Sequence, residues 1–302
     1  MKIEHILAGF VPGARGRDGL TLALLAARQA GARLTVAHVH VPAWPTPGPG
    51  KIDAEWQAYV AEQTAATLEQ ARRLLTDVRD VPIDYVSHAH RGSGRGLVQL
   101  AGKVEADMVV IGSAPGGGRG RIRIGSTADQ LLHTSPVPVA LAPRGYGDEP
   151  PPRLQRLTVA YRRDPASDEA VRQAFELAAQ MGTPLRLITL VLRAGRQVKV
   201  EEEMLGRIRE RVTADLEAIT QERGRVQVGV EVLEGKDVAT ALAHTDCEGS
   251  MLICASSETG PLRRVFLGDV SLKIIRSAPC PVMMLPRNPP KKSGTAGKHE
   301  KP

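Results

Sequence analysis

Residues 109–127 read VVIGSAPGGGRGRIRIGST, and a related stretch, LICASSETGPLRRVFLGDV, occupies residues 252–270. The second stretch begins 143 positions after the first. Each consists of a short apolar run, a loop, and the start of a short helical pattern. A Pro-rich apolar segment follows in both cases, SPVPV at 135–139 and APCPV at 278–282. Matching segments in the same order and at the same spacing indicate a tandem duplication.

Around these two stretches, apolar runs of strand length alternate with segments of helical periodicity. The order is βαβαβαβαβ in each half, which predicts an α/β fold with a parallel sheet covered by helices on both faces. We expect strands at 3–10, 34–41, 83–87, 108–112, 137–142, 157–161, 185–191, 226–232, 251–255 and 282–285. We expect helices at 20–30, 52–78, 96–104, 126–133, 167–181, 201–223, 238–244 and 270–277. This organisation predicts a first domain at 1–145, a second at 153–287, and a disordered basic tail at 288–302.

The composition fits such a fold and excludes several classes of protein. Hydrophobic residues make up 42% of the 302 residues and aromatic residues only 3%, which predicts an aliphatic core of buried parallel strands. The net charge of +7 favours anionic ligands, but no nucleic-acid-binding motif accompanies it. No apolar run is long enough for a membrane span. The three cysteines form no C-x-x-C pair and are expected to be buried free thiols, so we expect a cytoplasmic protein.

The loop of the first half carries the candidate ligand site. Ligands of open parallel sheets lie beyond the carboxyl ends of the strands, and Gly112 stands at such an end. Gly125, Ser126 and Thr127 open the next helix, where free amides, the helix dipole and two hydroxyls favour a phosphate. The alternative is that this glycine-rich loop only turns the chain and that the hydroxyl only caps the helix. Arg119, Arg121 and Arg123, between the two ends of the loop, are candidates to add positive charge.

In these residues and their spacing, the chain resembles the universal stress protein family over about residues 1 to 287. Nucleotide-binding members carry G-x2-G-x9-G-[ST] at this place, followed by a short helix and an S-P-C-P-V-like segment. The resemblance implies two flavodoxin-like, adenine nucleotide alpha hydrolase-like domains. Each would have a five-stranded parallel sheet of order 3-2-1-4-5, with pairing through the fifth strands, either between two chains or between the halves of one chain.

The resemblance also implies ATP or AMP binding, with Mg²⁺ only in the company of ATP. Gly112, Gly125 and Ser126 match the phosphate and ribose loop, Thr127 follows as a helix-start amide, and Val39 matches the position whose backbone meets the adenine.

This sequence departs from the family pattern in both halves. In the first half, Pro115 replaces the middle glycine of the motif and Val11 replaces an Asp after the first strand. In the second half, the motif glycines become Ala255 and Glu258, and Asp269 replaces the hydroxyl. An acid at a phosphate position repels the ligand, so we expect nucleotide in the first half only.

Two other groups of residues offer weaker alternatives. His38, His40, His88 and His90 lie near the ends of neighbouring predicted strands and could gather around a transition metal. Solvated or hydrogen-bonded histidines are the preferred interpretation, and no metal site is predicted. The stretch from Arg91 to Arg95 could contact an anion at the start of a helix, but a plain loop is preferred.

Three functions remain open at this point. The first is a stress-response regulatory module that senses an adenine nucleotide and recognises an unknown protein partner. The second is a nucleotide-free dimerising scaffold of the same fold. The third is a slow ATP hydrolase, although no nucleophile elbow, H-E-x-x-H or Walker A sequence supplies a catalytic group, so we do not expect an enzyme.

Overall fold

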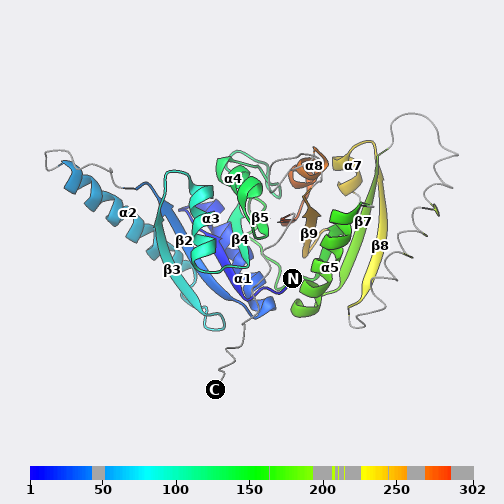
Figure 1. Cartoon of the computed structure of the whole chain (residues 1–302), viewed down its shortest axis with the longest axis horizontal. Coiled ribbons are helices and arrows are strands. Elements are labelled where there is room, and N and C mark those ends of the chain that lie inside the picture. The colour runs from blue at the N-terminus through cyan, green and yellow to red at the C-terminus, as the bar shows by residue number, and fades with distance from the viewer. Residues whose placement is uncertain are drawn as a thin grey trace, which may run out of the picture.

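The structure of the chain is a computed structural model (Figure 1). It describes residues 1–42, 52–162, 164–192, 226–243, 245–256 and 269–286, together with four single positions between 206 and 214. The helix predicted at 201–223 lies outside the described residues apart from those single positions. The tail predicted at 288–302, and Glu258 of the second loop, lie outside them entirely.

Strands and helices alternate through the first half as predicted, and in the second half they do so outside the interval between residues 192 and 226, most of which is not described. The first half contains β1 (His5–Gly9), α1 (Ala14–Ala30), β2 (Arg33–His40), α2 (Ile52–Leu74), β3 (Ile83–Ala89), α3 (Ser93–Lys103), β4 (Met108–Gly112), α4 (Ser126–Thr134) and β5 (Val139–Ala142). The second half contains β6 (Arg156–Ala160), α5 (Pro165–Met181), β7 (Leu185–Leu192), β8 (Val228–Gly235), α7 (Val238–Ala243), β9 (Ser250–Ala255), α8 (Asp269–Ser277) and β10 (Val282–Leu285).

All ten strands form one continuous sheet. Its order is β3-β2-β1-β4-β5-β10-β9-β6-β7-β8, which confirms the predicted 3-2-1-4-5 order in each half. Strands are parallel within a half, whereas β5 and β10 pair antiparallel, with Val139 opposite Met284 and Leu141 opposite Val282. The fifth strands therefore pair inside one chain, and the two predicted sheets are a single sheet.

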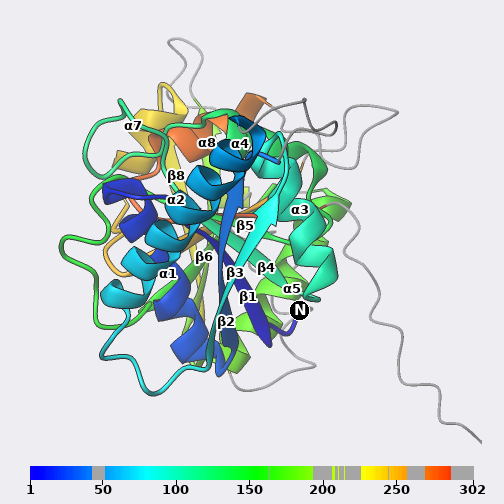
Figure 2. The ribbon, with the colours of Figure 1, turned by 90° about the vertical axis from the view of Figure 1, so that its left-hand side faces the viewer.

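Each face of this sheet carries one apolar core that runs through both halves. Helices α1, α2 and α5 cover one face, and α3, α4, α7 and α8 cover the other. Figure 2 shows α1 and α3 on opposite sides of the first-half strands. Alternate strand residues feed the two cores: Ile6 and Ala8 join the first, and Leu7 joins the second. This alternation follows from the period of two in a strand, and it explains why the strands read as continuous apolar runs.

Hydrogen bonds of two side chains, Asp18 and Gln180, fasten the connection between the halves. Asp18 of α1 is only 1% exposed, and its carboxylate accepts the N–H groups of Gly145 and Gly147. In α5, the Gln180 side-chain amide donates to the carbonyls of Ile3 and Ala30 at 2.6 and 2.8 Å. Helix α5 of the second half therefore packs beside α1 of the first.

The first helix begins earlier than the sequence pattern predicts, and its glycines explain why. We expected a start at residue 20, but α1 begins at Ala14. Gly16 and Gly19 disfavour a helix by propensity. Here they are needed for close packing: a Cβ at Gly16 would lie 1.8 Å from the Val11 carbonyl oxygen, and one at Gly19 would lie 2.6 Å from the Gly112 nitrogen.

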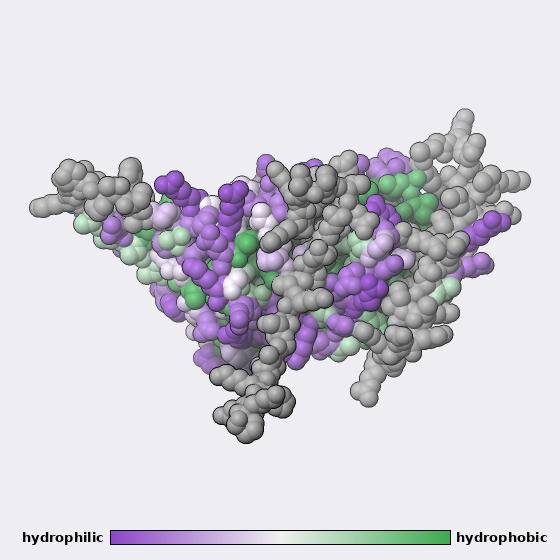
Figure 3. Space-filling model, viewed as in Figure 1, coloured by the Kyte–Doolittle hydropathy of each residue, from purple (hydrophilic) through white to green (hydrophobic). Residues whose placement is uncertain are grey.

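The described residues contain no membrane-spanning helix, and the face of the molecule shown in Figure 3 is mainly hydrophilic. Among the described residues, no helix combines the length and apolar character required to cross a bilayer. On the face shown in Figure 3, hydrophilic residues dominate the described surface and hydrophobic residues lie in small groups.

Candidate functional site

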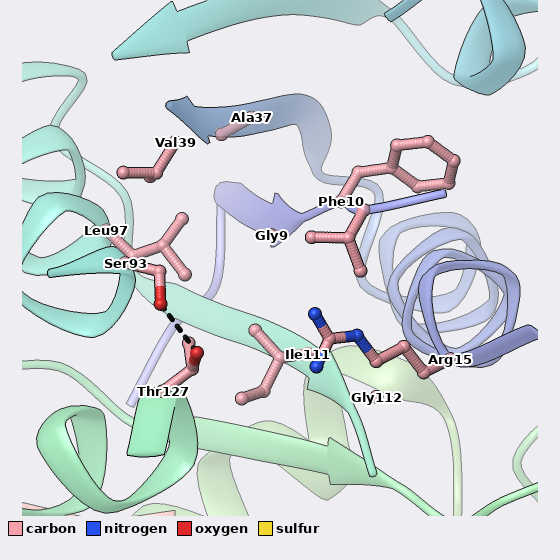
Figure 4. Close-up of a pocket in the computed structure, with 11 residues that line it drawn as sticks. Gly9, Phe10, Arg15, Ala37, Val39, Ser93, Leu97, Ile111, Gly112 and Thr127 are labelled. Carbon is pink, nitrogen blue, oxygen red and sulfur yellow. Dashed lines mark hydrogen bonds between the residues drawn. The ribbon is translucent and has the colours of Figure 1, made fainter. Parts of the chain in front are cut away.

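A cavity of about 80 Å³ lies at the carboxyl ends of the first-half strands, where the strand order changes direction between β1 and β4. This is the position at which open α/β sheets bind ligands, because the helices on either side of the switch point diverge there. The walls are formed by Gly9, Phe10, Val11, Arg15, Ala37, Val39, Ser93, Leu97, Ile111, Gly112 and Thr127 (Figure 4).

Three of the five predicted site residues line this cavity. Val39 comes from β2, Gly112 ends β4, and Thr127 belongs to the first turn of α4. Gly125 and Ser126 do not line it: Gly125 immediately precedes α4, and Ser126 is its exposed first residue. The structure thus brings Val39, Gly112 and Thr127 to one cavity, and Gly125 and Ser126 lie outside its lining.

Gly112 allows the closest approach between β4 and α1. A Cβ at this position would lie 1.9 Å from the carbonyl oxygen of Arg15, so even alanine would push the first turn of α1 outward. The expected role of Gly112 was an approach of backbone to ligand. The structure shows an approach of backbone to backbone, which holds the Arg15 turn against the cavity.

Arg15 supplies the charge of the cavity and was not among the residues predicted from the sequence. Its guanidinium extends from α1 toward the space between β1 and β4 (Figure 4). It makes no hydrogen bond or ion pair with any other described residue, and no carboxylate lines the cavity. A signal was available, because a helix that follows a parallel strand begins at the ligand edge, so cations in its first turn are candidates.

Two hydroxyls meet on the other side of the cavity. Ser93 begins α3, Thr127 lies in the first turn of α4, and their side-chain oxygens are 2.6 Å apart (Figure 4). Both belong to helix N-terminal turns, where unpaired backbone N–H groups and the helix dipole favour negative charge. Of the stretch from Arg91 to Arg95, only Ser93 lines the cavity.

The loop between β4 and α4 is closed by its own contacts. The N–H of Ala114 donates to the carbonyl of Arg123 at 2.9 Å, and the Arg123 guanidinium donates to the carbonyl of Pro115. Arg119 pairs with Asp148 at 3.2 Å, and Arg121 donates to the carbonyl of Ser277. The three loop arginines therefore serve contacts within the protein, and none lines the described cavity.

The second half has a cavity of about 250 Å³ at the corresponding place. Its walls include Arg162, Asp164, Thr189, Ala255 and Ser256. Here the positive charge is neutralised, because the Arg162 guanidinium lies 2.6 Å from the Asp164 carboxylate. Burial alone would raise the pKa of Asp164, but hydrogen bonds from Ser167 and Arg162 outweigh it and hold that pKa below its ordinary value.

The four histidines named in the sequence do not form a metal centre in the described part of the chain. Among those residues, no three His, Cys, Asp or Glu side chains gather at metal-binding distance. The His88 and His90 rings stack with centroids 6.3 Å apart, and His38 bonds the carbonyl of Phe10 at 3.2 Å. Burial lowers the pKa of His38, as expected for an imidazole held neutral.

Comparison with known proteins agrees with this architecture. The universal stress protein family model matches the chain twice, over residues 3–143 and 153–286. Universal stress protein Rv2319c of Mycobacterium tuberculosis is 38% identical over 291 residues, covering 93% of this chain and 99% of the relative. A universal stress protein of Mycolicibacterium smegmatis is 28% identical over 282 residues, covering 86% of this chain and 90% of that protein.

Solved structures show the same fold over the whole chain. A universal stress protein from Archaeoglobus fulgidus superposes with a TM-score of 0.63 at 15% identity, covering 95% of this chain and all of that one. A second structure, from Pseudomonas aeruginosa, gives 0.58 at 13% identity, with 94% of each chain covered. The duplication, the strand order and the two family matches agree: the chain belongs to the universal stress protein family, in its tandem two-domain form.

Proposed function

We propose that the protein is a stress-response regulatory module whose first domain, residues 1–145, binds an adenine nucleotide. The second domain, residues 153–287, would remain free of nucleotide. The observation that carries the proposal is the Arg15 guanidinium, which enters the switch-point cavity without a carboxylate partner among the described residues. An unpaired cation beside two helix N-termini favours an anionic ligand.

The arrangement of the walls assigns a role to each part of the nucleotide. Ala37 and Val39 of β2 offer an apolar wall for the base, in keeping with the position that Val39 matches in the family pattern. The phosphates would lie over the start of α4, with Thr127 in the cavity wall and Gly125 and Ser126 next to it in the chain. Arg15 would face them from α1. Mg²⁺ would enter only with ATP, because no carboxylate lines this cavity.

The two halves differ in a way that favours ligand in the first. Arg15 is available to an anion, whereas Arg162 in the second half is already paired with Asp164. Asp269 also begins α8 where Ser126 begins α4, and a carboxylate at a helix start competes with a phosphate for the same amides. The larger second cavity is therefore the less suitable one for a nucleotide.

A second candidate function is a nucleotide-free scaffold that recognises an unknown protein partner or dimerises. The size of the first cavity favours it, since about 80 Å³ is well below the several hundred Å³ typical of ligand pockets. Nucleotide binding would require Arg15 and the Ser93–Thr127 contact to open. We place either module in the cytoplasm, on the basis of the free cysteines. Slow ATP hydrolysis remains a third alternative without a candidate catalytic group.

Thermal unfolding with and without nucleotide tests the proposal. The unmodified protein is expected to gain thermal stability with ATP or AMP, because a ligand that binds only the native state stabilises it. Ser126→Asp, which copies the second half, is expected to abolish the shift, whereas the matched control Ser126→Ala keeps most of it. Ser126 is exposed, so neither change disturbs the core.

The absence of a shift with millimolar ATP and AMP in the unmodified protein would contradict nucleotide binding and leave the scaffold. Mass spectrometry under native conditions separates the halves further. One bound nucleotide per chain is expected, and two would contradict the assignment to the first domain alone.

A further inference from the structure

Two cysteines of the second half face one another outside both cavities. Cys247 is partly exposed in the turn before β9, and Cys280 is 3% exposed just before β10. Because β9 and β10 are neighbouring parallel strands, with Leu252 opposite Val282, the segments that lead into them lie side by side. Cys280 belongs to the apolar cluster on this face of the sheet, and Cys247 packs against that cluster.

Two arginines, each paired with a carboxylate, lie beside the more exposed thiol. The Arg156 guanidinium donates to the Asp246 carboxylate at 2.8 Å, and Arg186 donates to the Asp246 carbonyl at 2.7 Å. These two contacts hold both cations beside the residue that precedes Cys247. A hydrogen bond with Cys280, assisted by Arg186 and Arg156 and opposed by burial and by the Asp246 carboxylate, lowers the pKa of Cys247. The same hydrogen bond, together with burial, raises the pKa of Cys280.

The duplication supplies an internal comparison for this pair. By the repeat spacing of 143 residues, Cys247 is equivalent to Val104 of the first half and Cys280 is equivalent to Val137. Both valines belong to the apolar cluster on the same face of the sheet. Simple packing is therefore satisfied by two valines at these positions. The second half has a thiol at both positions: Cys247 is partly exposed and Cys280 is buried.

We propose that Cys247 and Cys280 form a peroxide-reactive dithiol, in which Cys247 is the attacking thiol and Cys280 the resolving thiol. A partly exposed thiol of lowered pKa beside a second cysteine is an arrangement that senses oxidants. Cys254, the third cysteine, is 2% exposed, and burial raises its pKa to about 12, so it remains reduced.

The reaction balances with hydrogen peroxide as the oxidant. The Cys247 thiolate attacks one peroxide oxygen, the O–O bond breaks, and hydroxide leaves, so that Cys247 becomes a sulfenic acid. The Cys280 sulfur then attacks Sγ of Cys247, and the sulfenic oxygen departs as water with the Cys280 proton. The two sulfurs together lose two electrons, and the peroxide is reduced to two waters once the hydroxide takes up a proton.

The disulfide would lie next to the connection between the halves. Cys280 leads into β10, and β10 pairs with β5 of the first half. A bond from Cys280 to the turn before β9 would fix the path of the chain into this strand. Oxidation would therefore stiffen the centre of the ten-stranded sheet rather than either ligand cavity.

Hydrogen peroxide added to the intact reduced chain tests the proposal. We expect two of the three thiols to be lost, a mass decrease of two hydrogens, and a linked Cys247–Cys280 peptide in a non-reducing digest. A dithiol reductant should restore all of them. Cys280→Val is expected to accumulate a sulfenic acid on Cys247 that dimedone traps, and Cys247→Val to keep both remaining thiols reduced. Each substitution introduces the first-half residue, so folding is expected to be preserved.

The control variant Cys254→Ala should still form the linked peptide. The proposal is overturned if peroxide leaves all three thiols titratable, if Cys254 reacts as fast as Cys247, or if the disulfide joins two chains on a non-reducing gel. The unmodified chain alone decides each of these outcomes, even if a variant fails to fold.

Discussion

The Ser93 hydroxyl of α3 lies 2.6 Å from the Thr127 hydroxyl of α4, across the cavity at the switch point of the first half. The two oxygens come from segments 34 residues apart in the chain, and both stand in the first turn of a helix. They join the two helices that flank the candidate phosphate position. A ligand that reaches the α4 amides would have to replace this bond with its own.

Removal of the Thr127 hydroxyl tests that relationship. Thr127→Val keeps the shape of the side chain and removes the oxygen. The free energy of unfolding should fall by less than about 1.5 kcal/mol, because a part-exposed hydrogen bond contributes little. The ATP-induced thermal shift should fall more clearly. Thr134→Val is the matched control, since Thr134 lies on the same helix and bonds the Gln130 carbonyl away from the cavity. An equal loss of shift in both variants would contradict a role for Thr127.

Substitution of Gly112 should destabilise the protein strongly. The new Cβ of Gly112→Ala would lie 1.9 Å from the Arg15 carbonyl oxygen, and overpacking of this kind costs about 1–3 kcal/mol or more. Gly102→Ala is the control, because a Cβ there meets no atom within 4 Å and lies inside helix α3. It should stabilise by up to about 1 kcal/mol. Urea denaturation measures the free energy of unfolding of both variants. An unchanged value for Gly112→Ala would contradict the close contact between β4 and α1.

The buried carboxylate of Asp18 should be essential to the linker. Asp18→Asn keeps the size but turns an N–H donor toward the N–H of Gly145 or Gly147, which leaves a buried donor unpaired. The expected loss in the free energy of unfolding is about 1–3 kcal/mol. Asp84→Asn, at an exposed position of β3, should change it far less. Chemical denaturation measures the free energy of unfolding of the two variants. An equal loss in both would contradict a special role for Asp18.

Stability should fall on the acid side of neutrality because of His5. This ring is 2% exposed; one nitrogen lies 2.8 Å from the Val104 carbonyl and the other lies 2.7 Å from the Thr35 hydroxyl. Burial, assisted by Arg33, lowers the pKa of His5 below its ordinary 6.5. The unfolded chain therefore binds the proton first, and the free energy of unfolding decreases as pH falls below 6.5.

Denaturation midpoints measured above and below that pH check the prediction. His5→Gln should be less stable at neutral pH but should lose less on acidification. A smaller dependence of the free energy of unfolding on pH should remain in this variant, because burial also lowers the pKa of His38. An unchanged slope in His5→Gln would assign the acid sensitivity to other groups.

The sequence was most informative where periodicity and packing agree. Strand β10 was predicted at its observed bounds, and the strand order followed from the family resemblance. The start of α1 was missed because the close contact of Gly16 with Val11 is invisible in a helical pattern. For the site, Gly112 and Thr127 were predicted from loop chemistry and Val39 from the family resemblance, and all three line the cavity. Arg15 was missed, since its position depends on how closely α1 approaches β4.

The sequence by itself determined the duplication, the α/β class and the inequality of the two halves, because spacing and residue identity are properties of a linear chain. Only the tertiary structure decided that the fifth strands pair within one chain, since register across a sheet depends on segments far apart in sequence. It also decided that Arg15 is unpaired in its cavity among the described residues while Arg162 is neutralised by Asp164. Burial and distance set the electrostatics of a site, and these quantities exist only after the helices have packed against the sheet.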